Sequence, residues 1–125
     1  DKLPKALHPT VFDMQVNAGS NAIKILQRLL ARFDQPVSVD GALGPQSIGV
    51  TKAAYKSAGS LFVEAYGIAR RNYYLALGDV KPGLRKFAQT RAGGKGGWII
   101  RAEEFISPRF RLSDADFQKR VAQWV

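Results

Sequence analysis

The sequence contains no cysteine, a single histidine and no long apolar run. Without thiols the chain can form no disulfide framework and no Cys-ligated zinc site, and it has no thiolate nucleophile. One imidazole, that of His8, excludes a site built from several histidines, and we expect neither a metal nor a cofactor. No segment approaches the roughly 18 apolar residues of a transmembrane helix, and the first residues lack the apolar core of a signal peptide.

Acidic residues are also scarce. Ten Asp and Glu stand against 19 Lys and Arg, which gives a formal net charge of +9 and indicates a polyanionic partner: nucleic acid, a membrane surface or an anionic cell wall. The stretch from Lys81 to Arg101 is basic throughout, contains no acid and includes Phe87 and Trp98. Such a stretch can grip phosphates and stack on bases, can neutralise carboxylates and stack on sugar rings, or is only a solvated loop.

The 125 residues are 46% hydrophobic, which is enough for one domain with its own core. Helical spacing dominates the pattern, and Pro, Gly and Ser mark the ends of the helices, with Ser20 and Ser113 as expected caps. Phe12 and Val16 provide the apolar spacing of the first helix, the wide apolar face of the fourth suggests a central helix, and residues 91–97 are expected to be flexible. We predict one compact all-α domain over residues 1–125 with six to seven helices, at about 9–18, 20–33, 45–57, 60–77, 82–87, 98–105 and 113–124.

Two polar patterns are candidates for a site. Asp13 and Asn17 are four residues apart and share one helix face, which either lines a polar groove or caps adjoining loops. The segment from Asp40 to Pro45 is typical of a turn that leads into a helix, and a structural role explains it completely.

The sequence nominates no catalytic pair of acids. Glycoside hydrolysis by the usual route needs two carboxylates on either side of the scissile bond. Glu103 and Glu104 are adjacent on a predicted helix and point about 100° apart, so they cannot flank one bond together. For Glu64 a role as the surface partner of a nearby base is the better explanation.

Several short motifs, taken in order, resemble a known family. They are Leu3-Pro4, Val11-Phe12-Asp13, Val16-Asn17-Ala18-Gly19, Leu26-Gln27-Arg28, Asp40-Gly41 with Gly44-Pro45, Arg71 with Tyr74, Phe87, and Gly97-Trp98 with Arg101. Over about residues 3 to 105 the chain is similar to the C-terminal, predicted peptidoglycan-binding part of the secretion-activator and phage-endolysin type of N-acetylmuramidase.

This resemblance implies a lysozyme-like, all-α fold that recognises the glycan strands of peptidoglycan. It also implies a bacterial or phage-encoded hydrolase that acts at the periplasm or cell wall. The family's catalytic acid lies in an N-terminal Glu-Gly-Gly motif, which is absent from this sequence. We therefore expect a fragment that lacks the catalytic segment and has no glycosidase activity by itself.

The resemblance places substrate binding at matching positions, namely Asp13, Asn17, Asp40, Gly41, Arg71, Tyr74, Trp98 and Arg101. Arginines can pair with wall carboxylates and aromatic rings can lie against sugars, although core packing is the favoured alternative for Trp98. The alternative function is a small basic nucleic-acid-binding module that uses Lys81 to Arg101, and a helical interaction domain with incidental basic charge is a third possibility.

Overall fold

The computed structural model describes residues 3–35 and 37–124. Within these ranges the chain forms helices and turns, with one isolated bridge between Gln89 and Lys95 and no strand, so the all-α prediction is confirmed. Three short 3-10 turns lie at Lys5–Leu7, Pro82–Leu84 and Pro108–Phe110. The α-helices are α1 (His8–Ala18), α2 (Asn21–Arg32), α3 (Pro45–Ala58), α4 (Ser60–Val80), α5 (Arg85–Ala88), α6 (Gly97–Glu103) and α7 (Asp114–Arg120).

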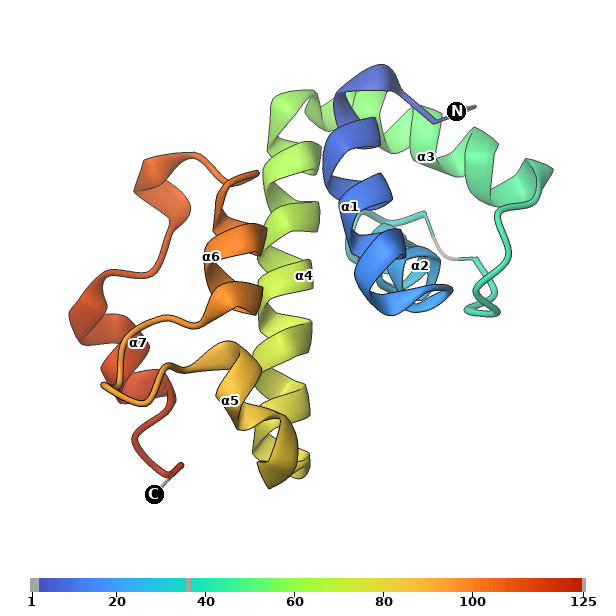
Figure 1. The fold of residues 1–125 in the computed structure, drawn as a ribbon. Coiled ribbons are helices and arrows are strands. Elements are labelled where there is room, and N and C mark those ends of the chain that lie inside the picture. Colours follow the sequence, from blue (N-terminus) through green and yellow to red (C-terminus); the bar gives the residue numbers. More distant parts are fainter. Residues whose placement is uncertain (1–2, 36, 125) are drawn as a thin grey trace.

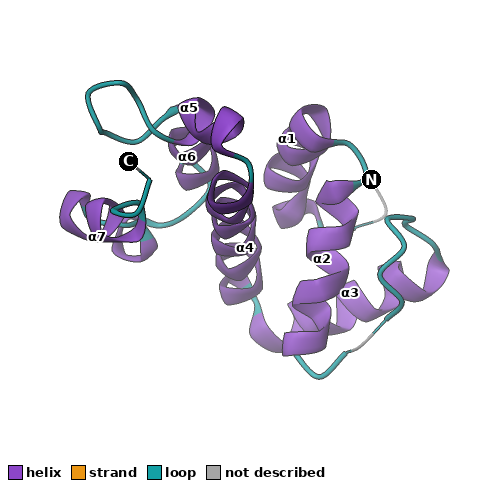
Figure 2. Ribbon diagram, turned by 90° about the horizontal axis from the view of Figure 1, so that it is seen from below, coloured by secondary structure: helices purple, strands orange, loops and turns teal. Residues whose placement is uncertain are grey.

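The long helix α4 is the axis of the fold. Helices α1 to α3 lie on one side of it and α5 to α7 on the other, as Figures 1 and 2 show from two directions. It packs against α1, α2, α3, α5 and α6. Its apolar surface covers more than one face because Phe62, Tyr66, Tyr74 and Leu75 are all buried, and the expected central position is confirmed.

The core joins α2 to α4. Ile23, Leu26 and Leu30 recur at three- and four-residue steps along α2 and are buried. Burial of each such side chain stabilises the fold by about 1.5–3 kcal/mol. The hydroxyl of Tyr66, also buried, donates a hydrogen bond to the carbonyl of Ala22 at 2.9 Å, which fixes the position of α4 against α2.

Two helix ends follow the signals in the sequence, and one expected cap does not form. Gly19 has φ 59°, a value at which a side chain would be strained, and it ends α1 as expected. Ser113 caps α7 because its side chain accepts a hydrogen bond from the amide of Asp116. Ser20 makes no such bond, since the turn from α1 to α2 holds its backbone in the helical region rather than the extended one that a cap requires.

The first helix turns the opposite face to the core from the one that the sequence suggested. Phe12 and Val16 are 68% and 71% exposed, whereas Val11 and Met14 are buried. A four-residue spacing identifies one helix face but does not say whether that face meets a partner. Here α1 packs on α2 and α4 through its other side.

Two further boundaries differ from the prediction for one reason. Gly78 does not end α4, which continues to Val80, and the last helix ends at Arg120 rather than at Trp124. The ring of Trp124 packs directly over Gly78, and its indole N–H donates to the carboxylate of Asp79 at 2.8 Å. Gly78 is therefore required by a close approach and not by a helix stop.

The glycine-rich segment 91–97, which the sequence suggested to be flexible, forms a hydrogen-bonded turn. The amide of Thr90 donates to the carbonyl of Gly94, and the amide of Gly96 donates to that of Ala88, both at 2.9 Å. A Cβ on Gly96 would lie 2.7 Å from the backbone of Ala88, so glycine allows this close return. In the described residues no helix is long and apolar enough to cross a bilayer.

The contact between Gly78 and Trp124 gives a first prediction. Gly78→Ala places a methyl group against the indole ring and should lower the free energy of unfolding by about 1–3 kcal/mol, as overpacking does. Gly49→Ala is the matched control, because this glycine lies within α3 with open space around it and the change should stabilise by about 0.5–1 kcal/mol. Urea unfolding of both variants measures the difference, and equal stabilities would contradict the packing described.

Candidate functional site

A groove of about 350 Å³ opens where α1 faces α5 and α6. It combines polar, basic and aromatic side chains from three segments that are distant in sequence. The last two turns of α1 contribute one wall, and the chain from α5 to α6 contributes the other. Its lining residues are Asp13, Val16, Asn17, Lys86, Phe87, Gly97, Trp98 and Arg101.

Asp13 is the electrostatic centre of this groove. One carboxylate oxygen of Asp13 accepts a hydrogen bond from Nε of Arg101 in α6 at 2.9 Å and forms an ion pair with its Nη2 at 2.7 Å. The other oxygen pairs with Arg70 of α4, whose side chain is completely buried. Because Asp13 stands between two guanidinium groups, it links the exposed Arg101 to the interior.

These contacts control the ionisation of Asp13. Partial burial alone would raise the pKa of its carboxyl group, but hydrogen bonds from Arg101 and Arg70 and their positive charges outweigh burial and hold the pKa below its usual range. Asp13 therefore stays ionised at neutral pH. A carboxylate held this way can orient Arg101 toward a ligand but does not suit the role of a general acid.

Aromatic rings form the other side of the groove. Trp98 stacks on Tyr74 with ring centroids 4.6 Å apart and planes at 20°, and it stacks on Phe87 at 5.1 Å and 29°. Trp98 is only partly buried, so it both packs against the core and lines the groove. Phe87 is 43% exposed and provides the most accessible aromatic ring of the three.

The structure brings four of the eight expected binding residues to this groove: Asp13, Asn17, Trp98 and Arg101. The other four lining residues, Val16, Lys86, Phe87 and Gly97, were not among the expected set. Val16, Phe87 and Gly97 belong to motifs that carry the family resemblance but were given no binding role, and Lys86 was part of the noted basic stretch. Only the folded groove shows that Lys86 and Phe87 face α1.

Arg71 and Tyr74 are buried beneath the surface. Arg71 pairs with Glu103 at 3.6 Å and donates to the carbonyl of Phe110 at 3.0 Å, which ties α4 to the segment before α7. Tyr74 supports Trp98 from below, and its hydroxyl lies 3.1 Å from the sulfur of Met14. Tyr74 therefore reaches the groove only through Trp98, and Arg71 does not line it.

Asp40 and Gly41 lie apart from the groove, in the loop between α2 and α3. The buried Gln27 holds them: its side-chain oxygen accepts from both of their amides at 3.0 Å, and its nitrogen donates to the Asp40 carboxylate. The amide of Ala42 and the side chain of Gln27 lower the pKa of Asp40. Gly41 has φ 77°, so the turn itself requires glycine.

Two glutamates line a second pocket, and one of them is held by hydrogen bonds within the protein. Glu64 and Glu104 both line a pocket of about 450 Å³, but both carboxylate oxygens of Glu64 accept hydrogen bonds from Ser107, one from its amide and one from its hydroxyl. Glu64 is thus a clamp on the turn before Pro108 rather than the partner of a base. Over the described ranges, no three His, Asp or Glu side chains gather closely enough to hold a metal ion.

Together these features define an all-helical domain with a basic, aromatic-lined groove that suits an anionic glycan. A family model described as a predicted peptidoglycan domain matches residues 21–103, and the chain belongs to this family. Peptidoglycan is therefore the partner of the domain, and the cell wall is where it associates. No curated protein and no solved structure matches the chain. Asp13 and Asn17 lie outside the matched range, and the other six expected residues lie within it.

The pairing of Asp13 with Arg70 gives a second prediction. Asp13→Asn leaves a buried guanidinium without its counter-charge, and we expect a loss of about 3–5 kcal/mol in the free energy of unfolding at pH 7. Because the folded pKa of Asp13 is lowered, its contribution is complete above the unfolded value of about 3.9 and is lost as pH falls through the folded pKa. The difference between the variant and the parent should thus shrink in acid.

Urea unfolding across this pH range measures the effect. Asp34→Asn is the control, since Asp34 is exposed and asparagine tolerates its positive φ of 60°, and it should change stability by less than about 0.5 kcal/mol. An Asp13→Asn protein as stable as its parent at pH 7 would show that the ion pair contributes nothing.

Proposed function

We propose that this chain is the wall-recognition part of an N-acetylmuramidase of the phage or secretion-associated type, and that the groove between α1, α5 and α6 holds a glycan strand. The observation that carries the proposal is the meeting of stacked aromatic rings with the Asp13–Arg101 pair in one groove of a peptidoglycan domain. The muramidase assignment rests on the resemblance described above.

The chemistry of peptidoglycan matches this groove. Its sugars present flat faces that can lie against Phe87 and Trp98, and its lactyl and peptide carboxylates can accept hydrogen bonds from Arg101. The Arg101 side chain is 58% exposed, and Asp13 already orients its guanidinium group. Binding of a ligand therefore costs less conformational entropy of this side chain. The net charge of +9 adds attraction that extends over a Debye length of about 8 Å at physiological salt.

The contacts of the stretch Lys81 to Arg101 favour the wall over nucleic acid. Two of its basic side chains are held by partners within the protein: Arg85 donates to the carbonyl of Gly78, and Lys95 pairs with Glu103. Affinity for a phosphate backbone depends on the number of phosphates that basic side chains neutralise, so each internal partner lowers the expected affinity for nucleic acid.

Wall binding gives a third prediction. Phe87→Ala removes an exposed ring from the groove and should weaken binding to purified sacculi about tenfold, as loss of a central aromatic contact does in other interfaces. Arg101→Gln should weaken it about threefold, since this side chain lies at an exposed edge. A pull-down with increasing amounts of sacculi measures both.

Matched surface changes control this experiment. Leu61→Ala removes an exposed apolar side chain, and Arg91→Gln removes an exposed charge, both outside the groove, and neither should alter retention. If the four variants bind equally, the groove is not the glycan site. Retention on DNA but not on sacculi would reject the wall function itself.

The resemblance gives a fourth prediction. The 125-residue chain should not clear a suspension of purified walls, because both oxygens of Glu64 are bound to Ser107 and the family's catalytic motif is absent from the sequence. Turbidity at 600 nm measures clearing, with an active lysozyme as the positive control. Clearing that is lost in Glu64→Gln or in Glu104→Gln would overturn the prediction and locate the acid.

A further inference from the structure

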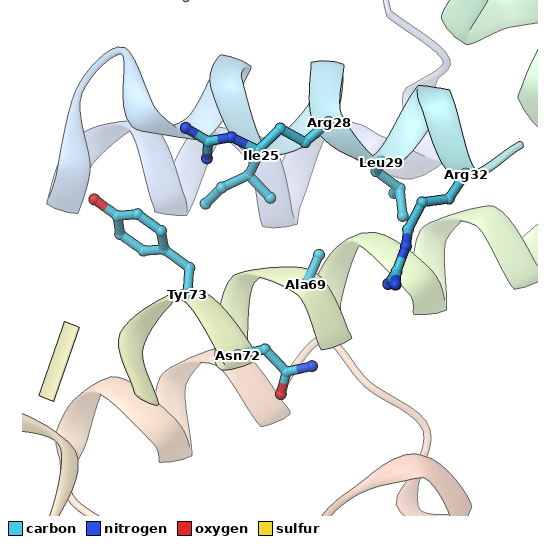
Figure 3. Close-up of a pocket in the computed structure, with 7 residues that line it drawn as sticks. All are labelled: Ile25, Arg28, Leu29, Arg32, Ala69, Asn72 and Tyr73. Atoms are coloured by element: carbon cyan, nitrogen blue, oxygen red, sulfur yellow. The ribbon is translucent and has the colours of Figure 1, made fainter. Parts of the chain in front are cut away.

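Another groove, of about 400 Å³, lies between α2 and α4 and is distinct from the pocket beside Glu64. In Figure 3, Arg28 and Arg32 extend from α2, and the ring of Tyr73 projects from α4 toward α2. The groove contains none of the residues that line the groove of α1, α5 and α6. It is therefore a separate site on the molecule, and nothing described so far gives it a role.

Among the residues that the structure describes, the two arginines of this groove have no carboxylate partner. Arg28 and Arg32 are one helical turn apart, so they occupy the same face of α2, and both are exposed. Within residues 3–35 and 37–124, neither takes part in an ion pair, whereas Arg70, Arg101 and Arg120 all do. No acidic side chain lines the groove. Two exposed cations on one helix face without a counter-charge are a favourable place for an anion.

The floor of the groove is apolar. Ile25 and Leu29 are 3% and 6% exposed and pack beneath the arginines, and Ala69 of α4 contributes only a methyl group opposite them. Asn72 and Tyr73 of α4 also line the groove, and in Figure 3 the Asn72 side chain extends away from α2. Over Ile25, Leu29 and Ala69 a sugar would leave hydroxyl groups without hydrogen-bond partners, and a bare phosphate would use the arginines but not these apolar side chains.

A ligand that contacts both the two arginines and the apolar floor carries a carboxylate next to small aliphatic groups. A short peptide with alanine-sized side chains and a free carboxylate has this chemistry, and a groove of about 400 Å³ falls in the size range of small-ligand sites. Planar guanidinium groups bind carboxylates through two parallel hydrogen bonds, which would fix the end of the peptide.

We propose that the groove between α2 and α4 is a peptide subsite, in which Arg28 and Arg32 bind the free carboxylate of a short aliphatic peptide over Ile25 and Leu29. The choice of a cell-wall peptide as the natural ligand rests on the proposed wall function. The existence of the subsite rests on the geometry and charge of this groove alone.

The test uses the whole 125-residue chain and a defined probe, N-acetyl-D-alanyl-D-alanine, followed by NMR. Addition of the peptide should shift the methyl signals of Ile25, Leu29 and Ala69 and leave those of Val16 unchanged. The C-terminal amide of the same peptide keeps the aliphatic groups but lacks the charge, and it should bind at least about tenfold more weakly. Equal binding of acid and amide would overturn the proposal.

Variants identify the groups that bind. Arg28→Gln and Arg32→Gln should each weaken binding of the acid about tenfold, while Arg91→Gln, an exposed arginine outside the groove, should leave it unchanged. Both groove arginines are exposed, so folding should persist, and the melting temperature checks this. Unchanged affinity in the two groove variants would reject the assignment.

A phosphate probe distinguishes the other source of negative charge. If glycerol phosphate shifts the groove signals and the peptide does not, the groove is a phosphate site and the peptide assignment is wrong. The titration contains no glycan, so its failure leaves retention on sacculi as an independent test of the proposed function. Conversely, loss of sacculus binding would not alter the outcome of this titration.

Discussion

The buried ion pair between Asp13 and Arg70 is the contact on which the arrangement of this protein depends most. Arg70 lies on the central helix with no exposed surface, and its Nε has no hydrogen-bond partner among the described residues. Burial of a guanidinium is costly unless a counter-charge and hydrogen bonds offset it, and here Asp13 and the carbonyl of Thr10 do so from α1. The same carboxylate then reaches Arg101, so one residue joins α1, α4 and α6.

Pairing of this kind also explains how the molecule distributes its charge. Asp13, Asp79 and Glu103 together account for all five ion pairs in the described part of the chain. Asp79 holds the C-terminal segment through Arg120 and Trp124, and Glu103 holds the turn at Lys95. These acids serve the structure, so the field that the protein presents outward is set by its excess of basic side chains.

The positions of the helices could be predicted from the sequence because the residue patterns that indicate a helix are local. Apolar spacing and punctuation by Pro and Gly predicted every α-helix, and the width of the apolar face predicted that α4 is central. Contacts between distant segments carried no such signal. The exposure of Phe12, the hydrogen bonds that Gln27 makes to Asp40 and the close packing of Gly78 against Trp124 each depend on a partner in another segment of the chain. For the same reason, the sequence could suggest Asp13 and Arg101 separately but not that they meet.

Tyr73 and Tyr74 are neighbours in the chain and face different grooves. Tyr73 lines the one between α2 and α4, while Tyr74 carries Trp98 on the side of α6, and their ring centroids are 6.0 Å apart. Both are attached to the same rigid helix, so a rotation of α4 that opened one groove would displace the support of the other. An occupant that favoured such a rotation would be thermodynamically linked to the second site, and the linkage would be equal in both directions.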